Sequence, residues 1–203
     1  MNNKGMLIVI SAPSGCGKSE MRKRLIERNE NIVYSISATT RNPREGECDG
    51  VDYFFLGQEE FMNKVDNEEF LEYARYGNNC YGTLKDYVFG KMADGKDVVL
   101  EIEVDGAMQV RKSYPGAVLV FILPPSMEEL RRRLDGRGTE TEEEKKIRTD
   151  IALKEITKAY QYDYIVVNDD IDRAVRELET VIEGERHVTG RMINKIDEVI
   201  ENA

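Results

Sequence analysis

The stretch of sequence that decides the fold is MLIVISAPSGCGKS, residues 6–19. It begins with a continuous apolar run, residues 6–11, which is typical of a strand buried on both faces of a parallel sheet. The next eight residues match the phosphate-binding loop pattern, except that Ala12 stands at the first glycine position. Residues 18–28 then carry apolar side chains at helical spacing. The sequence therefore predicts a strand, a loop and a helix in direct succession.

The predicted loop has the chemistry needed to hold phosphate groups. Gly15 and Gly17 let the backbone turn its N–H groups toward one anion, and the following helix adds its positive N-terminal end. Lys18 can reach the terminal phosphates, and the Ser19 hydroxyl can be a ligand of Mg²⁺. A glycine-rich turn without a ligand is the alternative, but the flanking strand and helix favour the phosphate loop. The predicted ATP-binding residues of the loop are Ala12, Pro13, Ser14, Gly15, Cys16, Gly17, Lys18 and Ser19.

Further apolar runs alternate with helix-like stretches along the chain. The runs are residues 97–102, 117–123 and 164–167; the helix-like stretches are residues 106–113, 126–134, 142–159 and 170–203, the last interrupted near residues 188–190. This alternation predicts an α/β fold, a parallel-sheet core flanked by helices. Residues 36–83 break it, with one helix-like piece at 58–67, and are interpreted as an inserted lobe. Residues 135–149 are interpreted as a mobile lid, which leaves residues 1–35, 84–134 and 150–203 for the core of a single domain.

The composition narrows the class of protein and its partners. The chain has 203 residues, 40% hydrophobic and 33% charged, as expected of a globular protein. Its formal charge of −10 argues against nucleic acid and anionic membranes as partners, so phosphate chemistry must depend on locally placed cations. Three widely spaced cysteines and one histidine give no zinc or disulfide pattern and favour the cytoplasm. The sequence leaves the oligomeric state open.

Motifs downstream of the loop resemble those of the guanylate kinase family, in order and at matching spacings. They are SISATTRNPR at residues 35–44, GVDYFF at 50–55, FLEYA at 70–74, YGT at 81–83, ILPPS at 122–126, RLDGRGT at 133–139 and VNDD at 167–170. The resemblance covers nearly the whole chain. It implies an enzyme of purine nucleotide metabolism that transfers the γ-phosphate of Mg-ATP to GMP, and also to dGMP, giving ADP and GDP from GMP.

The resemblance also implies how GMP is bound. The family holds the GMP phosphate with residues that match Ser37, Arg41, Arg44, Tyr53 and Tyr81. Two guanidinium groups and two phenolic hydroxyls suit a monophosphate. The guanine base would be read by Glu72 and Thr83, because a carboxylate accepts from N1–H and the 2-amino group while the threonine hydroxyl donates to O6. Adenine would leave the carboxylate unpaired.

The triphosphate site is completed, on the same resemblance, by residues from later in the chain. Arg137 and Arg148 match the arginines that the family closes over the triphosphate, and with Lys18 they are the predicted catalytic residues. Asn168 matches a position near the adenine of ATP, although a loop-capping asparagine would look the same. Glu101 stands where many family members have aspartate; it is predicted to bind Mg²⁺ through a water, beside the direct ligand Ser19, and to orient GMP.

Three carboxylates depart from the expected pattern. Glu20 follows the magnesium serine directly, Glu103 lies at the end of the strand 97–102, and Asp105 replaces the glutamine usual in the family. Each would disturb magnesium binding if it faced the phosphates.

Two other functions are weighed against the kinase. Guanylate-kinase-like domains of scaffold proteins bind peptides without catalysis, but they typically lack an intact phosphate loop, which this chain keeps. A phosphate-loop kinase with a different acceptor is the second alternative, and Glu72 and Thr83 argue against it.

Overall fold

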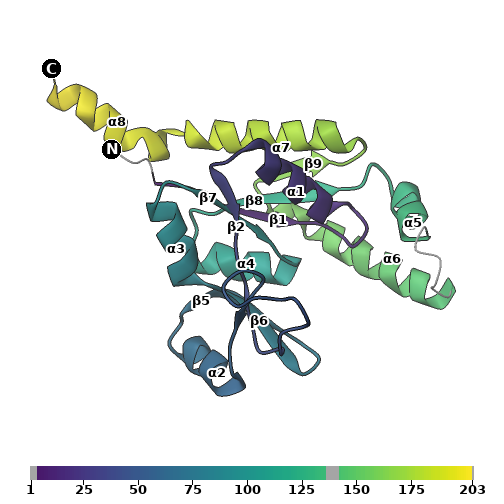
Figure 1. The fold of residues 1–203 in the computed structure, drawn as a ribbon. Helices are drawn as coiled ribbons and strands as arrows, with labels where there is room; N and C mark the ends of the chain where they lie inside the picture. The colour runs from purple at the N-terminus through teal and green to yellow at the C-terminus, as the bar shows by residue number, and fades with distance from the viewer. Residues whose placement is uncertain (1–3, 136–141, 203) are drawn as a thin grey trace.

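A five-stranded parallel sheet forms the centre of the computed structural model, which describes residues 4–135 and 142–202 (Figure 1). In spatial order its strands are β2 (Ile32–Tyr34), β7 (Asp97–Glu101), β1 (Leu7–Ser11), β8 (Val118–Leu123) and β9 (Tyr164–Val167). All four adjacent pairs are parallel. The predicted α/β fold is confirmed, and β1, which leads into the phosphate loop, is the middle strand.

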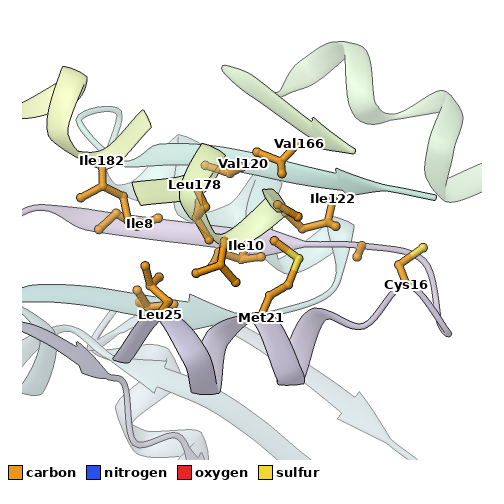
Figure 2. Packing of buried hydrophobic residues seen from close by; sticks show 14 of the residues in the cluster. Ile8, Ile10, Cys16, Met21, Leu25, Val120, Ile122, Val166, Leu178 and Ile182 are labelled. Atoms are coloured by element: carbon orange, nitrogen blue, oxygen red, sulfur yellow. The ribbon is translucent and has the colours of Figure 1, made fainter. Parts of the chain in front are cut away.

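Helices cover both faces of this sheet. They are α1 (Lys18–Arg28), α3 (Lys85–Ala93), α4 (Val104–Ser113), α5 (Met127–Asp135), α6 (Glu142–Thr157), the short 3-10 helix η1 (Ala159–Gln161) and α7 (Ile171–Arg186). The last helix, α8 (Thr189–Glu201), has no buried residue and projects from the body of the protein (Figure 1). Ile8 and Ile10 of β1 pack with residues of α1 and α7, as Figure 2 shows. Leu7 and Val9 point to the other face and pack with α3 and α4. Burial on both faces explains why β1 is a continuous apolar run.

A second, smaller sheet is built from the middle of the chain. Its strands, in spatial order, are β4 (Phe54–Phe55), β3 (Ala38–Thr39), β6 (Asn79–Leu84) and β5 (Phe70–Tyr76), with α2 (Gln58–Asp66) between β4 and β5 in sequence. The small core of this part contains Ala38, Phe61, Phe70 and Cys80. Strand β5 packs against α4, so the second sheet is attached to the central one through that helix (Figure 1).

The order of elements agrees with the sequence prediction for the core, and the ends differ by one or two residues. The predicted break in the C-terminal helix is confirmed, because α7 ends at Arg186 and α8 begins at Thr189. Strand β2 and helix α3 were not predicted. None of the helices in the described ranges is long and apolar enough to cross a membrane.

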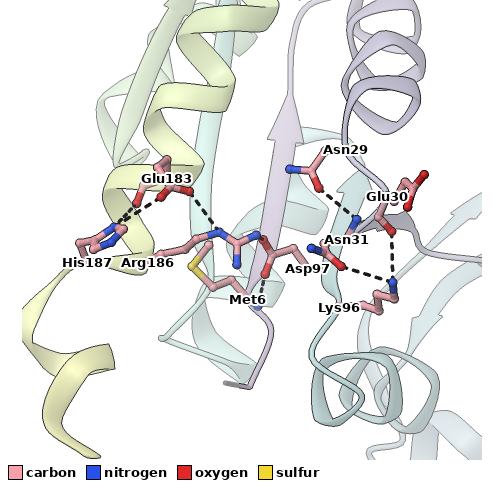
Figure 3. Close-up of polar contacts among 9 residues, drawn as sticks. All are labelled: Met6, Asn29, Glu30, Asn31, Lys96, Asp97, Glu183, Arg186 and His187. Atoms are coloured by element: carbon pink, nitrogen blue, oxygen red, sulfur yellow. Dashed lines mark hydrogen bonds and ion pairs between the residues drawn. The ribbon is translucent and has the colours of Figure 1, made fainter. Parts of the chain in front are cut away.

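The start of β7 is fixed by one buried carboxylate. Asp97 is completely buried; its Oδ1 accepts a hydrogen bond from the backbone N–H of Met6 at 2.8 Å, and its Oδ2 accepts one from Arg186 of α7 (Figure 3). This side chain therefore joins β7, the start of β1 and α7 at the end of the sheet away from the phosphate loop.

Candidate active site

The phosphate loop connects β1 to α1, and two of its residues have backbone conformations that favour glycine. Gly15 has φ +90° and Gly17 has φ +80°, in the left-handed region. A Cβ on Gly17 would lie 2.8 Å from Nδ2 of Asn168, so space as well as backbone conformation excludes a larger side chain there. The loop therefore has the local geometry that turns backbone N–H groups inward.

The underside of the loop is packed into the protein. Cys16 is completely buried within the apolar cluster between β1, α1 and α7 (Figure 2). Burial raises the pKa of its thiol to about 12, so the group is a neutral packing element. Asn168, itself 4% exposed, donates from Nδ2 to the Cys16 carbonyl at 2.7 Å. In this structure Asn168 thus supports the loop from behind, in agreement with the alternative of a loop-capping asparagine.

Lys18, the first residue of α1, lies among carboxylates. Its Nζ is 3.8 Å from Oε1 of Glu103, which follows β7 and precedes α4. Glu155 of α6 faces the same place. Burial, together with the neighbouring Glu103, raises the pKa of Glu155 to about 7. Lys18 belongs to the phosphate loop, so its ammonium group can exchange Glu103 for phosphate oxygens.

Ser19 and Glu101 meet, although 82 positions separate them in sequence. The Ser19 hydroxyl donates to Oε1 of Glu101 at 2.5 Å, at the end of β7 beside the loop. The other oxygen, Oε2, is buried without a hydrogen-bond donor among the described residues; Arg22 Nε lies 3.4 Å away. The Ser19 hydroxyl and the Glu101 carboxylate lie side by side, and one carboxylate oxygen has no hydrogen bond. These are oxygen ligands of the kind that a hydrated Mg²⁺ binds. Within the described ranges no group of three or more His, Cys, Asp or Glu side chains could hold a metal by itself.

Two of the carboxylates that depart from the family pattern form ion pairs with residues outside the loop. Glu20 accepts a hydrogen bond from Arg24 Nε at 2.8 Å, one helical turn later, and this pairing lowers the pKa of Glu20. Arg24 in turn contacts Asp172 of α7 at 3.0 Å. Asp105 pairs with Lys158 at 2.5 Å. The pairing of Glu20 with Arg24 partly neutralises the charge that the sequence suggested would disturb magnesium binding.

One of the two predicted lid arginines reaches the loop. Arg148, on α6, donates from Nη2 to the Ser14 hydroxyl at 2.8 Å. Arg137 lies outside the described residues. Helix α6 begins at Glu142, so the described end of the predicted lid is the first part of a helix.

The predicted guanine-reading pair lies on adjacent strands of the second sheet. Glu72 of β5 and Thr83 of β6 are direct neighbours in the register. The Thr83 hydroxyl donates to Oε1 of Glu72 at 2.7 Å, and both residues are buried. Burial raises the pKa of Glu72, since a carboxylate loses its hydration there. Gly106 of α4 leaves room at this carboxylate, because a Cβ would come within 3.1 Å of Oε2.

Two of the predicted phosphate-binding side chains, Tyr53 and Tyr81, lie beside Arg41. Its guanidinium lies 5.3 Å from the ring centroid of Tyr53, whose ring lies 6.1 Å from that of Tyr81. Both oxygens of Glu47 bind this guanidinium, at 2.8 and 2.9 Å, and one of them also accepts from the backbone N–H of Arg44. A carboxylate thus occupies the guanidinium fork as a phosphate would. The side chain of Arg44 is exposed, and the carbonyl of Ser37 accepts from Phe54 N–H at 2.9 Å.

Sequence reasoning missed three residues of this region. They are Glu47, which binds Arg41; Arg22, which lies beside Glu101 and 4.2 Å above the ring of Tyr34; and Glu155, which faces Glu103. The spacing of Glu47 from Arg41 and Arg44 within one loop was a usable signal. The other two are brought to the site only by tertiary folding.

A phosphate loop after the central strand, with an arginine of α6 on its rim and a carboxylate at the neighbouring strand end, defines a phosphate-loop nucleotide kinase. Comparison with known proteins identifies which one. The sequence model of the family described as "Guanylate kinase" matches residues 4–185, and the chain belongs to the guanylate kinase family.

Individual guanylate kinases are similar in sequence to this chain over nearly its full length. The chain is 48% identical to a guanylate kinase of Caldanaerobacter subterraneus subsp. tengcongensis, over 92% of this chain and 90% of the relative. It is 46% identical to a guanylate kinase of Halalkalibacterium halodurans, over 98% of this chain and 97% of the relative. The crystal structure of guanylate kinase from Anaplasma phagocytophilum aligns with a TM-score of 0.72 and 33% identity, covering 96% of this chain and 94% of that one.

Proposed function

We propose that the protein is a guanylate kinase that transfers the γ-phosphate of ATP to GMP or dGMP, giving ADP and GDP from GMP. The observation that carries the acceptor assignment is the buried pair of Glu72 and Thr83. A buried carboxylate retains acceptor positions for both guanine donors after it binds one hydroxyl. Leaving such a group unpaired, as adenine would, is costly, and sites of this kind discriminate by roughly 10⁴-fold.

The donor half of the reaction rests on the residues around the phosphate loop. Backbone N–H groups of the loop hold the β- and γ-phosphates, and Lys18 leaves Glu103 to bind them. Arg148, and Arg137 with it, neutralises the charge that spreads over the transferred group. A GMP phosphate oxygen attacks the γ-phosphorus in line, while the bond to the ADP oxygen breaks. The chain needs no strong general base for this step.

Magnesium is the proposed cofactor, with Ser19 as its direct ligand and Glu101 bound through a water. When bound, it would withdraw charge from the terminal phosphates. Glu101 also has a role of its own, because its position at the end of β7 lets it orient the acceptor.

The acceptor half rests on the second sheet. Arg41, Arg44, Tyr53 and Tyr81, with Ser37, hold the GMP phosphate, which displaces Glu47 from the Arg41 fork. In this organisation residues 36–83 are the GMP-binding lobe and residues 135–149 the lid of a single domain. Closure of the lobe and the lid would bring the GMP phosphate to the γ-phosphate of ATP. Three free cysteines fit the cytoplasm as its compartment.

A coupled assay with Mg-ATP and each of GMP, dGMP, AMP, CMP and UMP tests this function. Turnover of GMP and dGMP alone is expected. Equal turnover of AMP would refute the guanine assignment. No turnover of any of the five would return the interaction module as the better interpretation.

The Glu72→Gln variant tests the base-reading residue directly. We expect the KM for GMP to rise by about 100-fold or more, because the amide presents a donor to a guanine donor, while the KM for ATP changes less than about 3-fold. Burial raises the pKa of Glu72, so the wild type loses stability as the pH rises from the ordinary pKa of a glutamate toward the raised one, and the variant should melt no earlier than the wild type at pH 8. Glu59→Gln, exposed on α2 of the same lobe, is the control. Equal losses for GMP and ATP would contradict the assignment.

A further inference from the structure

Helix α4 lies along the outer edge of strand β5, where a further strand of the second sheet would pair. The spatial order of that sheet is β4, β3, β6 and β5, so β5 pairs with a strand on one edge only. The main-chain groups on the outer edge of such a strand have no ladder partner. Figure 1 shows α4 between the central sheet and β5, and the helix packs closely against this strand. Side chains of α4 are therefore placed to bind the unpaired edge.

Gln109 of α4 pairs with this edge as a residue of a neighbouring strand would. Its Oε1 accepts a hydrogen bond from the backbone N–H of Tyr73 at 3.1 Å, and its Nε2 donates to the carbonyl of the same residue at 3.1 Å. One planar amide thus engages both main-chain groups of one residue, which fixes the position and the orientation of the strand at that point. Tyr73 directly follows Glu72, the predicted guanine-reading residue.

Strand β5 needs this support because its ladder with β6 is irregular beside Glu72. The register shifts between Phe70 and Glu72. An irregularity of this kind re-aims side chains and interrupts the ladder, so the ladder alone holds Glu72 less firmly than a regular one would. The carbonyl of Leu71 accepts a hydrogen bond from the hydroxyl of Ser113, four residues after Gln109, at 2.8 Å. Two side chains of α4 thus bind the backbone before and after the guanine-reading residue.

The same face of α4 limits where the Glu72 carboxylate can lie. Gly106, three residues before Gln109, is so close that a Cβ there would lie 3.1 Å from Oε2 of Glu72. The other carboxylate oxygen, Oε1, accepts the hydroxyl of Thr83 at 2.7 Å. Gly106, Gln109 and Ser113 follow one another at spacings of three and four residues, so they share one face of the helix. This face contacts the carboxylate as well as the backbone on both sides of it.

We propose that Gln109 is a positioning residue for guanine recognition, which holds β5 against α4 and so keeps the Glu72 carboxylate where both guanine donors reach it. The inference rests on the proposed function, because it takes GMP as the acceptor. In this role Gln109 acts through Glu72 and touches neither nucleotide. Helix α4 begins at Val104, shortly after the end of β7 that carries Glu101. The helix that holds the base-reading strand therefore also follows the carboxylate proposed to orient the acceptor.

Steady-state kinetics of Gln109→Met test the proposal, since methionine has a similar length and makes neither hydrogen bond. We expect the KM for GMP to rise by about 10-fold, because both bonds to Tyr73 are lost. The KM for ATP and kcat should change less than about 2-fold, since the lost interaction serves GMP binding in ground state and transition state alike. Gln109→Asn, whose amide is one methylene shorter, should show the same pattern. Lys112→Met, exposed on the same helix, is the control and should behave as the wild type. An unchanged KM for GMP in Gln109→Met, or equal losses for GMP and ATP, would overturn the proposal.

A double-mutant cycle with Glu72→Gln separates positioning from a general loss of structure. If Gln109 acts through the Glu72 carboxylate, adding Gln109→Met to Glu72→Gln should lower kcat/KM for GMP by less than about 2-fold more. A further loss of about 10-fold would mean that Gln109 acts independently of Glu72 and would contradict the proposal. Melting curves should show that Gln109→Met lowers the midpoint by less than about 5 °C, and a larger fall would make the residue structural instead. A wild type that does not phosphorylate GMP would refute the proposed function itself, whereas an active wild type beside an unaffected Gln109→Met would refute this inference alone.

Discussion

Strand β7 carries a carboxylate at each end, and the two have different surroundings. At its start, Asp97 is buried and both oxygens are engaged, one by the Met6 N–H and the other by Arg186 (Figure 3). At its end, Glu101 holds the Ser19 hydroxyl with one oxygen, while the other is buried without a hydrogen bond among the described residues.

The difference separates stability from function along a single strand. A buried carboxylate with all partners supplied by the chain cannot accept a ligand without breaking the fold. A buried carboxylate oxygen without a hydrogen bond lowers the stability of the folded protein, and a bound ligand that pairs with this oxygen can remove that cost. In such sheets ligands bind at the carboxyl ends of the parallel strands, where loops connect the strands to the helices. Substitutions at the two ends should therefore affect different measurements.

The largest effect is expected at the ligand end, from Lys18→Met. We expect kcat to fall by about 10²–10³-fold, equivalent to about 2.7–4 kcal/mol, because a preorganised charge on the transferred phosphate is lost. The thermal midpoint should change little, since the ion pair of Lys18 with Glu103 is long, at 3.8 Å. Steady-state kinetics and calorimetry measure both quantities. Lys23→Met, an exposed lysine on the same helix, should leave both unchanged; a near-normal kcat for Lys18→Met would contradict the role given to Lys18.

At the other end, Asp97→Ala should lower the free energy of unfolding by about 1–3 kcal/mol, because the Met6 N–H loses the Asp97 carboxylate as its acceptor inside the protein. Burial raises the pKa of Asp97 in spite of the neighbouring Arg186, so the acceptor matters more than the charge, and Asp97→Asn should cost less. Urea denaturation measures the loss, and kcat well below the midpoint should stay normal. Asp94→Asn, exposed at the end of α3, is the control. A large fall in the kcat of Asp97→Ala without loss of stability would contradict the assignment of Asp97 to stability and Glu101 to function.

Much of the ligand end could be predicted from the sequence, because its signals are local. The apolar run of β1, the glycines of the loop and the helix after it are consecutive, so their relation does not depend on the rest of the fold. The outward turn of Glu20 also has a local cause in Arg24, four residues later. That spacing of four residues was a usable signal in the sequence.

The partners of the site residues could not be predicted in the same way. Asn168 reaches the Cys16 carbonyl across 152 positions, and Ser19 reaches Glu101 across 82. Such contacts depend on which strands lie side by side, and β1 pairs with β7 and β8 rather than with its neighbours in sequence. Helix α3 was missed although Val88 and Met92, both buried, have helical spacing, because the stretch is short and contains Gly90.

A moderate effect is expected from Glu101→Gln. We expect kcat to fall by about 10-fold, or about 1.4 kcal/mol, and the Mg²⁺ concentration for half-maximal rate to rise, because a neutral amide is a weaker partner for metal-bound water. Stability should be unchanged or slightly higher, since the amide removes a buried charge. Titration of the rate with Mg²⁺, beside a melting curve, measures both. Glu101→Asp, which keeps the charge, should retain more activity; a strong loss of stability in Glu101→Gln would make this end structural as well.

The smallest effect concerns Glu155, which faces Glu103 and Lys18 from α6 at the ligand end. Burial and the neighbouring Glu103 raise the pKa of Glu155 to about 7, from an ordinary value of 4.5. A carboxyl whose pKa is raised on folding contributes stability below its unfolded pKa, and that contribution is lost as the pH rises through the folded value. The difference in melting temperature between Glu155→Gln and the wild type should therefore grow in favour of the variant between about pH 4.5 and 7, and then stay constant. We expect less than about 2 °C, because the side chain is partly exposed. Taking the difference at each pH cancels the other titrating groups, and Glu143→Gln, exposed on the same helix, should show no such trend. A difference that is the same at pH 5 and pH 8 would mean that Glu155 is ionised throughout, and that Lys18 faces two full negative charges.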